Sequence, residues 1–123
     1  MTLFEECKEA LKADFKIIDG EAEKTAINTL NSYPIENGNI YWSRINYADY
    51  DSIDALLGAK NLKNNDVFVL ADDAEIPVFS TNLILLAENI YDVTALSPKL
   101  FIFNNEMILQ PLFPSEIFRV SMS

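Results

Sequence analysis

The stretch KLFIFNNEMILQPLF, from Lys99 to Phe113, indicates the fold more clearly than any other part of the chain. Its two apolar runs flank Asn104-Asn105-Glu106, and Asn is favoured in tight turns because it tolerates a positive φ. The stretch therefore predicts a β-hairpin. A further turn leads into EIFRVSM, Glu116 to Met122, where apolar and polar residues alternate as in a strand. The tail of the chain is expected to be a three-stranded antiparallel meander.

Upstream of this tail the apolar residues recur mainly at helical spacing. That spacing predicts four helices, over Thr2–Ala13, Glu21–Asn31, Asp49–Leu62 and Ser80–Ile90. Side-chain oxygens that could cap the free N–H groups of the first, third and fourth helices belong to Thr2, to Asp49 or Asp51, and to Ser80 or Thr81.

Between the helices lie segments with the pattern of strands. DFKIID, Asp14 to Asp19, is short, whereas DVFVLAD, Asp66 to Asp72, is a continuous apolar run that predicts a strand buried on both faces. Pro77 limits the following EIPVF to an edge strand or an extended loop. NIYWSRINY, Asn39 to Tyr47, is expected to be a strand or a strand-like loop, and DVTAL, Asp92 to Leu96, to be extended.

These elements predict an α+β fold with one mixed β-sheet that ends in the antiparallel meander and packs against about four helices. A chain of 123 residues is long enough for one domain with a real core, so residues 1–123 are taken as a single domain. No run of apolar residues is long enough to cross a bilayer, and the acidic start of the chain does not resemble an export signal. The expected location is the cytoplasm.

The chain is strongly acidic, with a net charge of −10. The segment from Asn46 to Asp92 holds nine acidic residues and only two lysines, Lys60 and Lys63, so it carries most of this charge. Such a field opposes binding to nucleic acid or to an anionic membrane and attracts a basic partner. The composition by itself also fits a solvated surface that keeps the protein soluble.

Several classes of catalytic site lack their residues. The chain has no histidine, one cysteine and three glycines, which excludes histidine-based triads, the usual zinc sites and glycine-rich phosphate loops. The cysteine, Cys7, lies on the apolar stripe of the first expected helix and is interpreted as a core residue. We expect no cofactor and no catalytic residue.

Two clusters of carboxylates are the remaining candidates for chemistry. Asp72, Asp73 and Glu75 could hold Mg²⁺ or form an acid–base pair, but cations that would bind a substrate phosphate are not close in sequence. Asp49, Asp51 and Asp54 form a D-x-D-x-x-D pattern, but an EF-hand loop needs Gly at its sixth position, where Asp54 stands, and Glu at its twelfth, where Lys60 stands. Because those residues are missing, we expect no metal site, and Asp72 to Glu75 are interpreted as an exposed acidic turn.

Aromatic residues gather between the second and third expected helices. Trp42, Tyr47 and Tyr50 lie near Arg44, and Trp, Tyr and Arg are the residues most often found at the centre of protein interfaces. The alternative is that Trp42 belongs to the core and Tyr47 to a cross-strand pair. The sequence favours neither.

The second half of the chain resembles a known family. VFVLADD is followed by EIPVFSTNL, a helix and DVTALSPKLFIFN, and NIYWSRIN lies upstream. This order resembles the immunity proteins that bacteria pair with contact-dependent growth inhibition toxins, over Asn39 to Asn104. The first two helices match no pattern of that family.

The resemblance implies a cytosolic antitoxin without enzymatic activity. Its partner would be the C-terminal toxin domain of a CdiA-like effector, often a nuclease, bound one-to-one with its active site blocked. Such families diverge quickly, so the motif transfers no binding residue, and the candidate contacts rest on charge and aromatic character. They are Asp49, Asp51, Asp54, Asp72, Asp73, Glu75, Trp42, Tyr47 and Tyr50.

Two other functions are open at the level of the sequence. One is a small carboxylate- or metal-dependent hydrolase built on Asp72 and Asp73. The other is an adaptor whose strand Glu116–Met122 adds to the sheet of a partner by β-augmentation.

Overall fold

A computed structural model describes residues 2–122 of the chain. Its α-helices are α1 (Leu3–Ala10), α2 (Gly20–Asn31), α3 (Ile53–Ala59), α4 (Leu83–Glu88) and α5 (Ile90–Thr94). Its 3₁₀ turns are η1 (Lys12–Asp14) and η2 (Trp42–Arg44). Its strands are β1 (Phe15–Ile17), β2 (Ile35–Glu36), β3 (Asn39–Ile40), β4 (Ala48–Tyr50), β5 (Asp66–Ala71), β6 (Phe79–Asn82), β7 (Leu100–Phe103), β8 (Met107–Pro111) and β9 (Phe118–Met122).

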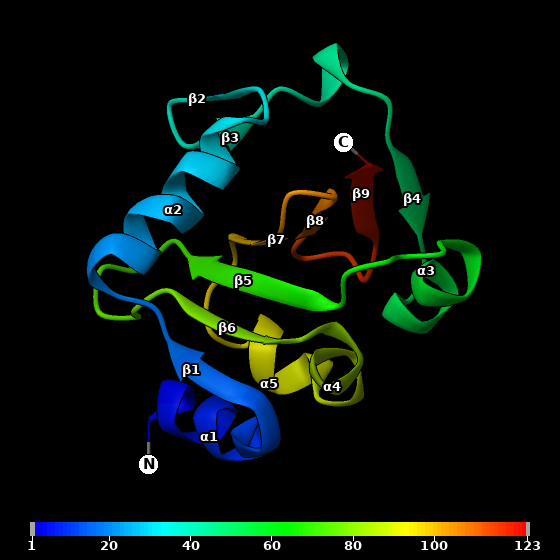
Figure 1. Cartoon of the computed structure of the whole chain (residues 1–123). Coiled ribbons are helices and arrows are strands. Elements are labelled where there is room, and N and C mark those ends of the chain that lie inside the picture. The colour runs from blue at the N-terminus through cyan, green and yellow to red at the C-terminus, as the bar shows by residue number, and fades with distance from the viewer. Residues whose placement is uncertain (1, 123) are drawn as a thin grey trace.

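Seven strands form one twisted sheet in the order β1-β6-β5-β7-β8-β9-β4, and β2 and β3 form a small separate hairpin (Figure 1). Every pairing among the described strands of the sheet is antiparallel, which is simpler than the mixed sheet we expected. The α+β class and the meander β7-β8-β9 are confirmed.

The opening stretch occupies the middle of this sheet. β7 is the fourth of the seven strands, and all four of its residues are buried. Leu100 and Ile102 face one core, and Phe101 and Phe103 face the other, because side chains alternate along a strand.

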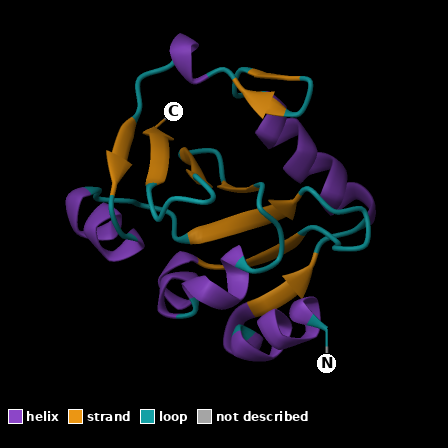
Figure 2. Ribbon diagram, turned by 180° about the vertical axis from the view of Figure 1, so that it is seen from behind, coloured by secondary structure: helices purple, strands orange, loops and turns teal. Residues whose placement is uncertain are grey.

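Helices cover the two faces of the sheet unequally. One face packs against buried residues of α1, α3, α4 and α5, including Cys7, Leu56 and Leu86. The other packs against α2 and the β2–β3 hairpin, with Ala26 and Leu30 turned inward. Figures 1 and 2, which show opposite sides of the molecule, place α1, α4 and α5 together and α2 with the β2–β3 hairpin well apart from them.

The β7–β8 turn is where we expected it, although its mechanism differs. Neither Asn104 nor Asn105 has a positive φ; among the described non-glycine residues only Asn37, in the β2–β3 turn, has one. Instead the buried Asn104 side chain accepts hydrogen bonds from the backbone N–H groups of Glu106 and Met107 and donates to the carbonyls of Asn64 and Asp66. This amide holds the turn and the start of β5 together.

Several expected helix boundaries are wrong. Thr2 caps α1 as predicted, but α1 ends at Ala10. Asp49 and Asp51 do not cap α3, because the Ser52 hydroxyl accepts the hydrogen bond from the Ala55 N–H and Asp49 lies in β4.

The fourth helix also begins later than predicted. Ser80 and Thr81 belong to β6, and the Asn82 side chain caps α4 by accepting from the N–H groups of Ile84 and Leu85. In β6 the buried Phe79 and Thr81 alternate with half-buried residues. These residues are therefore in a strand, where the sequence predicted the first turn of the helix.

Two segments expected to be extended contain helical turns. DVTAL lies mostly in α5, and WSR forms η2. Within EIPVF, Glu75 and Ile76 lie in a turn and a bend, and Pro77 and Val78 are outside any regular element. Phe79 begins β6, which pairs with β1 and β5, so the expectation of an edge strand is wrong.

Candidate functional site

The antiparallel order brings most of the acidic segments to one end of the sheet. The last residues of β5, β8 and β4 and the first residues of β6, β7 and β9 all lie at this end, because neighbouring strands alternate in direction. Asp72–Glu75 follow β5, Asp51 follows β4 and Glu116 precedes β9. We call this the acidic end of the sheet. β5 and β4 are four strand spacings apart, so the two predicted acidic clusters are separated by about 19 Å along it.

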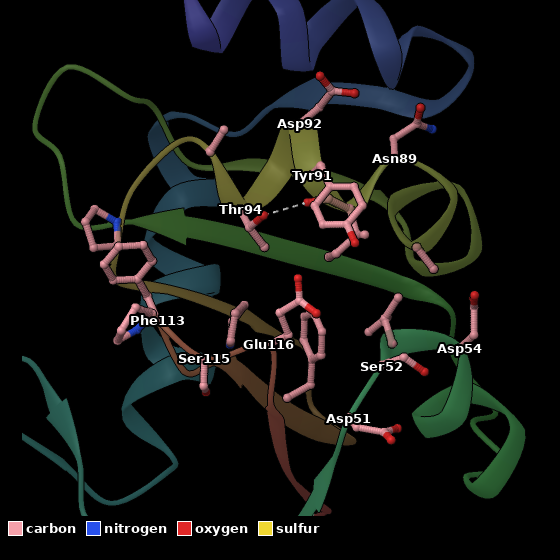
Figure 3. A pocket seen from close by; sticks show the side chains of 18 of the residues that line it. Asp51, Ser52, Asp54, Asn89, Tyr91, Asp92, Thr94, Phe113, Ser115 and Glu116 are labelled. Carbon is pink, nitrogen blue, oxygen red and sulfur yellow. Dashed lines mark hydrogen bonds between the residues drawn. The ribbon is translucent and has the colours of Figure 1, made fainter.

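A groove of about 690 Å³ lies at this end, between the start of α3, the α4–α5 region and the β8–β9 connection (Figure 3). Five carboxylates line it, those of Asp51, Asp54, Glu88, Asp92 and Glu116. Among the described residues that line it there is no lysine or arginine. We call this site the acidic groove.

Local structure explains why the groove is acidic. Ser52 starts α3 as its N-cap, which leaves Asp51 outside the helix and Asp54 in its first turn, where a carboxylate is favoured by the helix dipole. On α5 the buried Val93 points into the core, so its neighbour Asp92 remains exposed. In Figure 3 Glu116 lies between α5 and the start of α3, with Asp51 and Asp54 on the α3 side, and the Asp92 carboxylate on α5 points away from Glu116.

The groove also exposes two aromatic rings. Tyr91 on α5 is 77% exposed and Phe113 in the β8–β9 connection is 69% exposed, the highest values among the large hydrophobic residues described. The turn that carries Phe113 is held by the Leu112 N–H, which donates to the Ile117 carbonyl, and by the Ser115 hydroxyl, which donates to the Leu112 carbonyl. A groove with apolar walls, exposed rings and excess carboxylates suits a basic protein segment.

The carboxylates of the groove are available to a partner. Within residues 2–122 the described hydrogen bonds and ion pairs use none of the five side chains. Their negative charges are therefore not neutralised inside the protein.

The predicted acidic turn, Asp72 to Glu75, is confirmed as an exposed turn. The Asp72 N–H donates to the Lys99 carbonyl, and one Asp73 carboxylate oxygen accepts from the Glu75 N–H at 2.9 Å. Asp73 thus shapes the turn, whereas the Asp72 and Glu75 side chains project into solvent.

Two of the three predicted aromatic residues, Trp42 and Tyr47, form a separate cluster on the opposite face of the sheet. Trp42 and Tyr47 meet edge to face at 5.6 Å between ring centroids, and the Arg119 guanidinium lies 4.1 Å from the Tyr47 centroid and 5.6 Å from that of Trp42. The Trp42 indole N–H donates to Gln110 at 3.2 Å. Trp42 also packs against the second core, so it is half-buried and only partly available to a partner.

Asp49 belongs to this arginine cluster, which consists of Trp42, Tyr47, Asp49, Gln110 and Arg119. Arg119 donates to both Asp49 carboxylate oxygens, at 2.7 and 3.0 Å, from the neighbouring strand. The hydrogen bond from Arg119 holds the pKa of Asp49 below its usual value, and the same bond raises the pKa of Arg119. The Asp49 charge is therefore already paired within the protein.

Tyr50 lies apart from both groups. It lies opposite Phe118 of β9 and is half-buried against the core that α1, α3, α4 and α5 cover. It points away from Asp49 because consecutive residues of β4 face opposite sides of the sheet. The nine predicted residues are thus divided among the groove (Asp51 and Asp54), the acidic turn (Asp72, Asp73 and Glu75), the arginine cluster (Trp42, Tyr47 and Asp49) and the core (Tyr50).

Sequence reasoning missed the other half of the groove. Glu88, Tyr91, Asp92, Phe113 and Glu116 come from three elements that the order of residues does not place together. The signals that could indicate this half are weak: DVTAL contributes its first three residues to α5, and Pro114-Ser115 forms a turn beside Phe113.

The alternative functions find little support in the geometry. Within residues 2–122 no three His, Cys, Asp or Glu side chains come together as a metal site, and no helix is long and apolar enough to cross a membrane. Burial, together with the nearby charge of Asp92, raises the pKa of the Cys7 thiol to about 11, so at neutral pH it is a protonated core residue. β9 pairs with β8 on one side and β4 on the other, which contradicts β-augmentation through Glu116–Met122.

Comparison with known families gives one finding. The family model described as CdiI immunity protein EcoliA0-like matches residues 1–121, almost the whole chain. No curated protein matches the sequence.

Proposed function

The chain belongs to the CdiI immunity protein family, and from this premise we propose that it binds a basic CdiA toxin domain one-to-one and blocks it through the acidic end of the sheet. The toxin is expected to be a nuclease, and the complex to form in the cytoplasm. The protein contributes no catalytic step and binds neither nucleic acid nor membrane.

The observation that carries this proposal is the unneutralised charge of the acidic groove. Five acidic residues line the groove, and no cationic side chain is among the described lining residues. A nuclease binds phosphates through lysine and arginine side chains, and carboxylates can occupy the same cationic surface. Occupation of that surface would exclude the nucleic-acid substrate.

The contacts that we propose are Asp51 and Asp54 in the groove and Asp72, Asp73 and Glu75 in the acidic turn. All five side chains are exposed, and only that of Asp73 accepts a described hydrogen bond. Trp42, Tyr47 and Asp49 form the arginine cluster on the other face, so a toxin that contacts them as well must reach around the edge strand β4.

The test is the salt dependence of association. The C-terminal domain of the large secreted protein encoded immediately upstream is purified in a catalytically inactive form and mixed with the immunity protein in a stopped-flow instrument. Electrostatic steering predicts that the association rate constant falls by about tenfold or more as NaCl rises from about 0.05 to 0.5 M. Isothermal titration calorimetry gives the stoichiometry, which is expected to be one.

Two results would contradict the proposal. If the two proteins do not bind at low salt, this chain is not the immunity protein of that domain. If the association rate constant does not depend on salt, the acidic end of the sheet is not the binding surface. Titration with Mg²⁺, Mn²⁺ and Ca²⁺ is a separate check on the hydrolase alternative, and we expect no heat of binding.

A further inference from the structure

We infer that the acidic groove, rather than the acidic turn, receives an arginine-bearing segment of the toxin. This inference rests on the proposed function and narrows it to one surface and one kind of side chain. It depends on three features of the groove, which are its charge, its exposed rings and its shape.

The charge of the groove selects a cation. Asp51 and Asp54 lie at the start of α3, Glu116 lies before β9 and Asp92 lies on α5, as Figure 3 shows. Glu88, the last residue of α4, also lines the groove. Because these carboxylates come from separate elements along one groove, a segment that carries arginine can meet a carboxylate at several positions. Like charges gathered in this way repel one another, and a bound cation relieves that repulsion.

The exposed rings favour arginine over lysine. Tyr91 and Phe113 are the most exposed large hydrophobic residues described, and both line the groove. A guanidinium stacks on an aromatic face while its N–H groups donate to a carboxylate in bidentate fashion, whereas an ammonium acts as a point charge. A ring beside a carboxylate is therefore a better site for arginine.

The chain contains this arrangement once already. Arg119 lies 4.1 Å from the Tyr47 ring centroid and donates to both oxygens of Asp49, at 2.7 and 3.0 Å. The groove is also lined by rings, Tyr91 and Phe113, and by carboxylates, and no guanidinium is among its described lining residues. The toxin is proposed to supply it.

The shape of the groove favours a protein segment over a free ion or a nucleic acid. Its volume is about 690 Å³, within the range of sites that bury drug-sized groups, and Pro98, Pro111 and Phe118 contribute apolar surface to its walls. A hydrated metal ion would gain nothing from those walls, and a phosphate backbone would be repelled by the carboxylates.

Paired variants of equal charge test the inference. In the groove variant Asp54→Asn/Glu116→Gln, two groove carboxylates are neutralised. In the control variant Glu36→Gln/Asp66→Asn, two exposed carboxylates outside the groove and the acidic turn are neutralised, and neither makes a described side-chain hydrogen bond. The acidic-turn variant Asp72→Asn/Glu75→Gln is measured as well and is expected to lose less affinity than the groove variant. Affinity for the inactive upstream toxin domain is measured by calorimetry, and circular dichroism confirms that each variant is folded.

We expect the groove variant to lose affinity by about tenfold or more and the control variant by less than about threefold. Tyr91→Ala and Phe113→Ala are expected to weaken binding by about three- to tenfold, as for lost cation–π contacts. Equal losses in the groove and control variants would overturn the inference but leave the proposed function standing, because wild-type binding would remain. Failure of the wild-type protein to bind would instead contradict the proposed function.

The toxin side of the interface tests the choice of arginine. Each toxin arginine is changed to lysine and to alanine, and binding to wild-type and to Glu116→Gln protein is compared in double-mutant cycles. For at least one toxin arginine, both substitutions are expected to lower the affinity of the complex, and the cycle is expected to show a coupling energy with Glu116. The inference is wrong if every toxin arginine can be replaced by lysine without loss of affinity. It is also wrong if analytical ultracentrifugation shows that this chain is a dimer that Tyr91→Ala dissociates.

Discussion

The Asp49–Arg119 pair allows one prediction to be worked out in full. Removal of either charged partner, by Asp49→Asn or by Arg119→Gln, is expected to lower the free energy of unfolding. The two side chains are 38% and 23% exposed and make a bidentate contact at 2.7 and 3.0 Å. Exposed ion pairs contribute about 0.2–1 kcal/mol, and bidentate geometry places this one near the upper limit, at about 1 kcal/mol.

Arginine has a second contact that aspartate lacks. Its guanidinium lies over Tyr47 at 4.1 Å, a cation–π interaction that adds about 0.5–1 kcal/mol at a partly exposed site. Arg119→Gln is therefore expected to cost about 1.7 kcal/mol, and the double variant about the same. The coupling energy of the cycle is then about 1 kcal/mol.

Urea unfolding followed by far-ultraviolet circular dichroism measures these energies. With an m-value of about 2 kcal/mol per molar, a loss of 1 kcal/mol lowers the midpoint by about 0.5 M. The pKa of Asp49 is lowered in the folded protein, so the contribution of the pair is present above the ordinary value of 3.8 and is lost as the pH falls below it. The coupling energy between Asp49 and Arg119 should therefore be constant at neutral pH and fall as the pH drops below 3.8.

Two outcomes would refute this reasoning. A coupling energy below about 0.3 kcal/mol at pH 7 would show that the pair is solvent-screened and structurally unimportant. A loss of toxin affinity above about tenfold in Asp49→Asn, without loss of stability, would show that Asp49 contacts the toxin instead of serving the fold. The cycle thus also separates the two roles that the sequence allows for this residue.

Three further predictions concern buried or capping groups. Asn104→Ala removes four hydrogen bonds to the backbone and should cost about 3 kcal/mol by urea unfolding, whereas Asn28→Ala, on the exposed side of α2, should change stability by less than about 0.5 kcal/mol. Ser52→Ala removes the N-cap of α3 and should cost about 1 kcal/mol in the same assay, and an unchanged midpoint would contradict the capping role. The Cys7 thiol should not react with Ellman's reagent in the folded protein at pH 8. Because folding raises the pKa of this thiol from 9.0 to about 11, the protein should lose stability as the pH rises from 9 to about 11. A Cys7→Ala variant should not show this loss.

Local sequence patterns predicted those elements whose burial and local preference agree. Lys99–Phe113 alternates between two cores and carries its own turn residues, so it was correctly placed as a hairpin. The patterns failed where tertiary packing decides between two local options. Ser80 and Thr81 are good N-caps, yet they lie in β6 because Phe79 and Thr81 are buried in the sheet, and Asn82 takes over the cap.

The partners of Asp49 could not be predicted for a related reason. Asp and Asn before a helix usually cap it, and Asp49 stands shortly before α3. Its actual partner, Arg119, is 70 residues away and becomes a neighbour only because β4 pairs with β9 at the edge of the sheet. Nothing in the local sequence indicates that pairing.

The distribution of charge shows why the binding surface has to be read from the fold. In the sequence, most of the charge lies in the acid-rich segment from Asn46 to Asp92. In the structure Asp49 is paired and Asp66 starts β5 at the opposite end of the sheet, so neither adds to the groove. Glu116, from a tail of no net charge, does add to it, because antiparallel pairing returns β9 to the acidic end. The field that a basic toxin meets is therefore set by which strand ends lie together, and a variant that alters total charge without altering the groove should affect the rate of encounter more than the lifetime of the complex.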